Sequence, residues 1–322
     1  MTSRRSFVLG AAALGTAIGT LAQSRSGVRI GWVSYTPPGP ALAAFQEGMR
    51  ALGYAGGSEV GIEVRVVEPN PERVRAAFEE LRALPVALIV AQAAIAPAVH
   101  RVNAGRLPIV FAFSGDPVVA GMVDSFGRPG GNTTGMSFLA LELVGKRIEV
   151  MREIAPSVRR VAILANPQHP GEKAEQRASL DAAQRMNVQT SYVQILPGDT
   201  TDAAFERIRQ ERVQGLVVFQ DAGMVARAAS IAAFALRERL VAISGWAQFA
   251  RSGFVATYGP NLEDVYRRLA GYADRLIKGA RAANLPVELP TRVELVVNLK
   301  SAKALGLAIP QSLLVRADEV IQ

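Results

Sequence analysis

The stretch Val86-Ala87-Leu88-Ile89-Val90-Ala91 is an uninterrupted apolar run of the length of one β-strand. Such a run is typical of a parallel strand that helices cover on both faces. A helical pattern over residues 97–103 follows it, and then a second apolar run over residues 108–113. This strand–helix–strand order predicts a parallel α/β sheet with right-handed crossovers.

The same alternation extends in both directions along the chain. Before the quoted run we expect strands over 28–34 and 62–67 and helices over 41–52 and 71–84. After residue 136 we expect a second series, with helices over 140–154, 172–186, 203–210 and 224–239 and strands over 160–165, 188–196, 215–219 and 240–244. Two series of this length predict two Rossmann-like α/β lobes with parallel sheets.

The segment Arg128-Pro-Gly-Gly-Asn-Thr-Thr-Gly135 interrupts the alternation. Its glycines and proline predict a turn or hinge, and no lysine follows as a phosphate-binding loop would require. Near the C-terminus we expect a helix over 262–278, an extended linker over 285–290, a last strand over 293–299 and a short helix to 305. Because these pieces complete sheets already begun, they predict a multi-strand hinge, with residues 28–135 plus 260–288 in lobe 1 and 136–259 plus 289–322 in lobe 2.

The N-terminus has the parts of an export signal. Arg4 and Arg5 precede an apolar run over residues 9–22, and small residues precede a cleavage site that we expect after Ala22. Paired arginines resemble the twin-arginine signal of proteins that fold before export. We therefore expect residues 1–22 to be removed and the mature protein to lie in the periplasm, the alternative being an apolar, disordered tail.

Composition excludes several kinds of chemistry. The chain has no cysteine and only two histidines, which excludes disulfides, a lipidated-cysteine anchor and metal sites of the usual nitrogen and sulfur type. We expect no metal and no cofactor, since no dinucleotide-binding glycine pattern and no nucleophile elbow occur. His100 and His169 have no ligand-spaced partner and are expected to be structural or at the surface.

The net charge of +8 falls to +6 if Arg4 and Arg5 are removed. The remaining basic residues alternate with acidic ones, and no basic stripe is interleaved with aromatic residues, so we expect no nucleic-acid partner. Nothing in the sequence marks an enzyme. An α/β enzyme stays open as an alternative only because the fold by itself does not exclude one.

Candidate ligand-binding residues follow from the expected strands, because ligands of open parallel sheets bind beyond the carboxyl ends of the strands. We expect ligand contacts from Ser34, Tyr35, Thr36, Gln92, Ser114, Gly115, Asp116, Ser137, Asn166, Asp221, Trp246 and Tyr258, and Gly245 lies at the same edge. Hydroxyls, amides, acids and aromatic rings suit a small polar ligand with an apolar part.

Helix capping is the competing interpretation of these polar residues. Serine, asparagine and aspartate at a strand–helix junction commonly cap the helix. Asp116 is followed by Pro117, as at an ordinary helix start, and Asp221 suits capping and ligand contact equally well. Trp246 could equally be part of the hydrophobic core.

Several long motifs recur in order. They are the C-terminal run over residues 285–321, Pro108-Ile-Val-Phe111, Asp116-Pro-Val118, Gly121-Met-Val123, the segment 128–135, and Tyr258-Gly-Pro260. From Val28 to the end, the chain resembles the tryptophan/tyrosine-type substrate-binding proteins of ABC transporters, which have the type I periplasmic binding protein fold.

The resemblance implies a monomeric, two-lobed protein that closes on a small molecule and delivers it to an ABC permease in the inner membrane. Characterised relatives are associated with aromatic amino acids, and in such proteins an acid often holds the ligand's ammonium group. Asp221 lies where lobe 2 could supply that acid, although Ala222-Gly223 is smaller than the family pattern and leaves the ligand open. An exported sensor that signals to a receptor is the alternative function. A sugar-repressor-like regulator would share the fold but carry an N-terminal helix-turn-helix instead of an export signal.

Overall fold

The computed structural model describes residues 27–54, 60–138, 141–196 and 198–322. The export signal expected over residues 1–22 lies outside them. Within the described part of the chain, no helix combines the length and the apolar character that crossing a membrane requires.

The apolar run over residues 86–91 lies in β3, a central strand of the first sheet. This sheet has five parallel strands in the order β2-β1-β3-β4-β5. The strands are β1 (Val28–Ser34), β2 (Val60–Val66), β3 (Val86–Gln92), β4 (Ile109–Phe113) and β5 (Thr133–Ser137).

Helices cover both faces of this sheet, which is why β3 carries no polar face. Leu88 and Val90 pack in the cluster formed with α1 (Gly39–Ala51) and α10 (Leu262–Ile277). Ile89 and Ala91 point the opposite way, because side chains alternate along a strand, and pack with residues of α2 and α3. The remaining elements of this lobe are α2 (Pro71–Ala83), η1 (Ala93–Ile95), α3 (Ala96–Asn103) and η2 (Ala282–Asn284).

The second sheet has seven strands in the order β12-β11-β10-β9-β8-β6-β7. All neighbouring pairs are parallel except β10 and β11. The strands are β6 (Arg160–Ala165), β7 (Gln189–Gln194), β8 (Gly215–Val218), β9 (Val241–Ser244), β10 (Ala256–Pro260), β11 (Val293–Asn298) and β12 (Glu319–Ile321).

Helices also cover both faces of the second sheet. One hydrophobic cluster joins it to α4 (Glu142–Ile154), α5 (Glu172–Arg185), α11 (Leu299–Ala304) and α12 (Gln311–Arg316). The other joins it to α6 (Asp202–Gln210), α7 (Ala222–Ala226), α8 (Ala228–Arg237) and α9 (Ala247–Arg251). Two lobes with parallel sheets confirm the predicted fold class.

Two expectations about local structure are wrong. β5 lies inside and beyond the segment expected to be a turn, and it crosses the lobe boundary expected at residues 135 and 136. Gly135 permits this pairing, because it has φ 150° and a Cβ there would lie 2.0 Å from the carbonyl oxygen of Phe111. The single helix expected over 224–239 is two helices, since α7 ends at Ala226 and α8 begins at Ala228.

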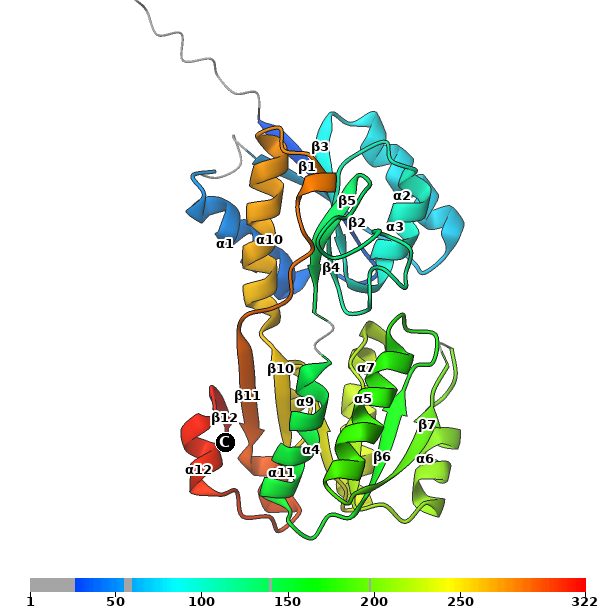
Figure 1. Cartoon of the computed structure of the whole chain (residues 1–322), viewed down its shortest axis with the longest axis vertical. Coiled ribbons are helices and arrows are strands. Elements are labelled where there is room, and N and C mark those ends of the chain that lie inside the picture. Colours follow the sequence, from blue (N-terminus) through cyan, green and yellow to red (C-terminus); the bar gives the residue numbers. More distant parts are fainter. Residues whose placement is uncertain (1–26, 55–59, 139–140, 197) are drawn as a thin grey trace, which may run out of the picture.

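The chain passes between the two sheets three times, as Figure 1 shows. The first passage follows β5, the second leads from β10 to α10, and the third leads from Glu288 to β11. Backbone bonds hold the passages together, since the N–H of Asn261 donates to the carbonyl of Arg292 and Glu288 bridges to Met136.

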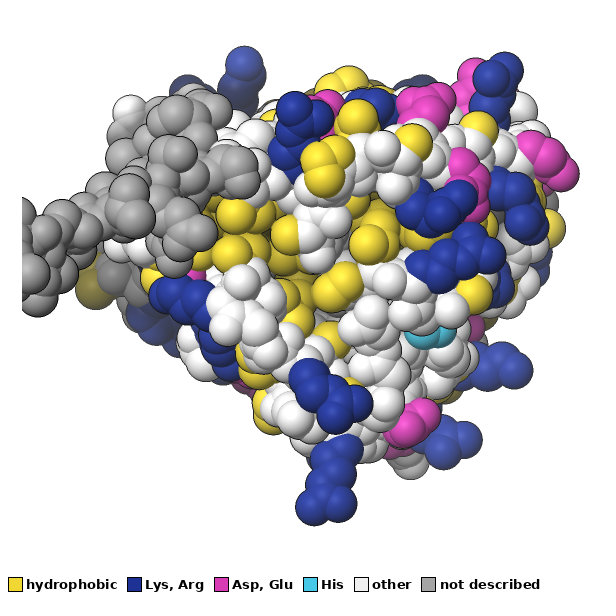
Figure 2. All heavy atoms as spheres, turned by 90° about the horizontal axis from the view of Figure 1, so that it is seen from above, with side chains coloured by type: hydrophobic (Ala, Val, Ile, Leu, Met, Phe, Trp, Pro, Cys, Tyr) yellow, Lys and Arg dark blue, Asp and Glu magenta, His cyan; other side chains and the backbone are white. Residues whose placement is uncertain are grey.

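At the end of lobe 1 that faces away from lobe 2, viewed in Figure 2, hydrophobic side chains lie among lysine and arginine side chains.

Candidate ligand-binding site

The two lobes touch where the carboxyl end of β4 meets the carboxyl end of β6. Ser114 Oγ lies 2.8 Å from Nε2 of His169. The backbone N–H of Asp116 donates to the carbonyl of Pro170 over 3.2 Å. Gly115 lies between these contacts, and a Cβ there would lie 2.3 Å from the Pro170 carbonyl oxygen. The approach of the lobes therefore depends on a residue without a side chain.

Charge and burial act in opposite directions on His169. Burial lowers the pKa of its imidazole below the ordinary value, whereas the negative charges of Asp221 and Glu175 oppose the shift. The ring also lies against Phe113, with the centroids 6.1 Å apart. Burial at the contact between the lobes therefore disfavours the charged form of this imidazole.

Lobe 1 contributes a row of polar groups at the ends of its strands. Ser34 Oγ donates to the carbonyl of Thr36 at 2.7 Å, which closes the turn after β1. Gln92 Oε1 accepts a hydrogen bond of 2.9 Å from the indole of Trp32. Ser137 Oγ donates to the carbonyl of Gly115 at 3.0 Å, and so ties β5 to the loop that touches lobe 2.

Tyr35 lies at the same edge of lobe 1 and is half-buried. Burial raises the pKa of its phenol, and the positive charge of Arg101 partly offsets this. The phenol therefore stays protonated at neutral pH and can donate a hydrogen bond.

The acids and the amide expected at this edge do cap local structure. Asp116 Oδ1 accepts from the backbone N–H groups of Val118 at 2.8 Å and Val119 at 3.1 Å. Asp221 Oδ1 accepts from the N–H of Met224 at 2.8 Å and begins α7. Asn166 Oδ1 accepts from the N–H of Gln168 at 3.0 Å.

Asp221 differs from Asp116 in its surroundings. It is only 5% exposed, and its charge reaches His169 in the contact between the lobes. The cap uses one of its two carboxylate oxygens. Capping and ligand contact are therefore compatible at this position.

Trp246 brings an aromatic surface to the junction of the lobes. Its ring lies edge-on to Phe138, with centroids 5.5 Å apart and planes at 63°. Phe138 follows β5 of lobe 1, whereas Trp246 follows β9 of lobe 2. Both rings are buried, and the indole Nε1 has no hydrogen-bond partner among the described residues.

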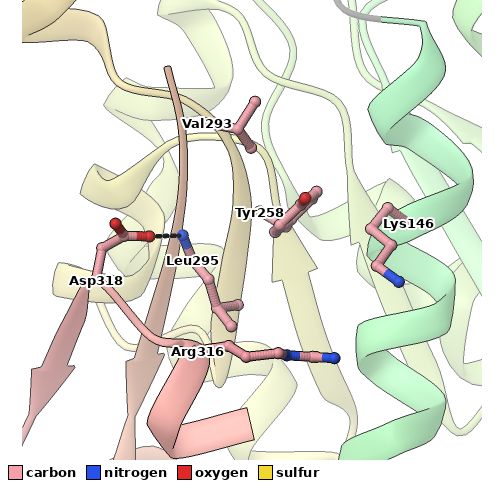
Figure 3. Close-up of a pocket in the computed structure, with 6 residues that line it drawn as sticks. All are labelled: Lys146, Tyr258, Val293, Leu295, Arg316 and Asp318. Atoms are coloured by element: carbon pink, nitrogen blue, oxygen red, sulfur yellow. Dashed lines mark hydrogen bonds between the residues drawn. The ribbon is translucent and has the colours of Figure 1, made fainter. Parts of the chain in front are cut away.

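The side chain of Tyr258 lines a cavity whose lining includes none of the other predicted ligand-binding residues. This cavity of about 260 Å³ lies in lobe 2 and is also lined by residues of α4, β11 and α12 and by Asp318 (Figure 3). Both cations of this cavity are neutralised locally, since Lys146 bonds Glu149 at 2.6 Å and Arg316 bonds Glu153 at 2.7 Å. We therefore place the candidate site at the contact between the lobes.

One residue of the candidate site was not among those predicted to contact ligand. His169 was expected to be structural or at the surface, and its ring lies at the contact between the two lobes. Its position in the loop after β6, which begins Asn166-Pro167, was the available signal, because that loop lies at the carboxyl edge. Among the residues that the structure describes, no three or more histidine, aspartate or glutamate side chains are grouped to hold a metal ion.

Comparisons with known proteins agree with this architecture. The family model for ABC transporter substrate binding proteins matches residues 40–321. A tyrosine-binding protein from Clostridioides difficile (strain R20291) is 23% identical over 202 residues, which are 62% of this chain and 57% of that protein. The chain thus matches little more than half the length of that relative.

Solved structures share the fold at low identity. The ABC domain from Streptococcus pneumonia in complex with L-Trp superposes with a TM-score of 0.81 at 21% identity, covering 92% of this chain and 100% of that one. A conserved domain protein from Vibrio cholerae gives a TM-score of 0.80 at 21% identity, covering 91% and 99%.

Proposed function

Because the chain belongs to the family of ABC transporter substrate-binding proteins, we propose that it binds an aromatic amino acid between its lobes and delivers it to an ABC permease. The contact between Ser114 and His169 carries the proposal, because it places the polar strand ends of both lobes against one another. The names of the relatives support the ligand class, since one is a tyrosine-binding protein and another structure contains L-Trp.

Each part of such a ligand has a partner at this site. The carboxylate of Asp221 pairs with the ammonium group, since a buried carboxylate favours an opposite charge. The Gln92 amide accepts from Trp32 and keeps its N–H groups for the ligand carboxylate. The rings of Trp246 and Phe138 offer an apolar wall to the aromatic side chain.

Binding by lobe closure follows from the three chain passages. Lobes joined by several short segments can rotate as rigid bodies, and a ligand that contacts both lobes stabilises the closed form. The permease then recognises that form. In this scheme the mature protein is exported to the periplasm without residues 1–22, and it performs no catalysis.

Ligand-induced stabilisation of the purified protein tests this function. L-Tyrosine and L-tryptophan should raise the melting temperature, because a ligand at 100 times its Kd stabilises the folded state by about 2.7 kcal/mol. L-Alanine, D-tyrosine and glucose serve as controls for the ring, the chirality and the ligand class. Stabilisation by glucose alone, or formation of a product from either amino acid, would refute the proposal.

A further inference from the structure

A buried ion pair lies beneath the carboxyl edge of the second sheet. Arg147 of α4 has a side chain that is 0% exposed, and its Nη1 donates to Glu175 Oε1 of α5 at 2.9 Å. The same guanidinium donates through Nε to the carbonyl of Tyr258 at 3.1 Å. One side chain thus joins two helices to β10.

Gln220 connects this ion pair to the end of β8. Its Nε2 donates to the same Glu175 oxygen at 3.0 Å, and Gln220 directly precedes Asp221 in the chain. Glu175 also acts electrostatically on His169. The ion pair is therefore adjacent to the acid and to the histidine of the candidate ligand site.

Gly245 brings the end of β9 into the same cluster. A Cβ on Gly245 would lie 2.4 Å from Gln220 Oε1 and 2.7 Å from Arg147 Nη2. Neither of these two buried atoms has a hydrogen-bond partner among the described residues. The donor Arg147 Nη2 and the acceptor Gln220 Oε1 thus lie beside the backbone of Gly245, which directly precedes Trp246.

We propose that Arg147 is a positioning residue for ligand binding. With Glu175 and Gln220 it fixes the backbone of β10 and the backbone at the ends of β8 and β9, and through them the carboxylate of Asp221 and the ring of Trp246. The role in affinity rests on the proposed function, whereas the fixing of Trp246 does not. A buried ion pair adds little stability compared with apolar residues of the same volume, which favours a role in defining one geometry.

Removing both charges separates positioning from stability. Arg147→Met and Glu175→Met alone should each lower the melting temperature, because each leaves one buried charge unpaired. The double variant should recover most of that loss, because no charge is then left without its partner. Its Kd for L-tyrosine or L-tryptophan should nevertheless stay about tenfold higher than that of the wild type.

A measurement without ligand tests the same point. The chain has two tryptophans, so a Trp32→Phe background leaves the fluorescence of Trp246 alone. Acrylamide should quench Trp246 more strongly in the double variant than in the background protein, although the two melting temperatures are close. The proposal would be overturned if the double variant had wild-type affinity and if its quenching equalled that of the background protein.

Gly245→Ala tests the cluster with both charges in place. The added Cβ displaces Gln220 Oε1 and Arg147 Nη2, so the variant should show the same rise in quenching. Gly271→Ala is the matched control, because apart from its chain neighbours and its own helix backbone no described atom lies within 4 Å of a Cβ at that position. If the wild type binds neither amino acid, the proposed function fails, and the quenching measurement alone decides whether the cluster positions Trp246. If the double variant does not fold, Gly245→Ala decides, and unchanged quenching there would refute the positioning role.

Discussion

Ser114→Ala should weaken ligand binding by removing the hydrogen bond that joins the lobes. In the structure, Ser114 Oγ lies 2.8 Å from His169 Nε2, and Ser114 is only 2% exposed. When the lobes separate, water replaces the missing hydroxyl at the imidazole. The substitution therefore acts on closure and leaves each lobe folded.

The size of the effect follows from the burial of the contact. Leaving one buried polar group without its partner costs about 1–3 kcal/mol. Since each 1.4 kcal/mol is tenfold in an equilibrium constant, the Kd should rise roughly 5- to 150-fold. The melting temperature of the ligand-free protein should change little, because Ser114 makes no other side-chain bond that would be lost within lobe 1 among the described contacts.

Isothermal titration calorimetry with L-tyrosine and L-tryptophan measures this change. Ser252→Ala is the matched control, because its Oγ bonds the carbonyl of Gln248 within one exposed turn at 2.8 Å. The control should bind as the wild type does. An unchanged Kd for Ser114→Ala, with wild-type binding established, would refute the argument that the interlobe hydrogen bond stabilises the closed form.

Three further outcomes are expected. Asp221→Asn should raise the Kd for either amino acid by about tenfold or more in calorimetry, because it removes a charge-assisted bond to the ammonium group. Its melting temperature should stay unchanged, because asparagine also caps helices. Wild-type affinity in this variant would contradict the assignment of Asp221 to the ammonium group. Burial at the contact between the lobes lowers the pKa of His169, so affinity should be full above the ordinary pKa of 6.5 and fall as the pH drops below it. A pH titration of the Kd that is equally steep in His169→Gln would exclude this cause. Gly135→Ala should lower the free energy of unfolding, with backbone strain alone contributing about 1–3 kcal/mol. Urea denaturation measures this change, with Gly271→Ala as the control. Wild-type stability of Gly135→Ala would show that β5 tolerates a side chain.

The lobes and their layers could be predicted because each strand carries its own burial pattern. The apolar run of β3 requires cover on both faces, and α1, α10, α2 and α3 supply it. β5 was not predicted, because its glycine-containing sequence resembles a turn and only pairing with β4 makes it a strand. The break at Arg227 was missed for a related reason, since no proline or glycine marks it.

The sequence by itself determined the apolar runs, the alternation of strands and helices, and the polar residues that follow each strand, since these depend on neighbours in the chain. Only the tertiary structure decided which of those residues meet. Ser114 and His169 are 55 residues apart, and Arg147 is 111 residues from the carbonyl of Tyr258 that it binds. Contacts at such separations depend on how the two sheets are placed by three chain passages, and no local pattern encodes that placement.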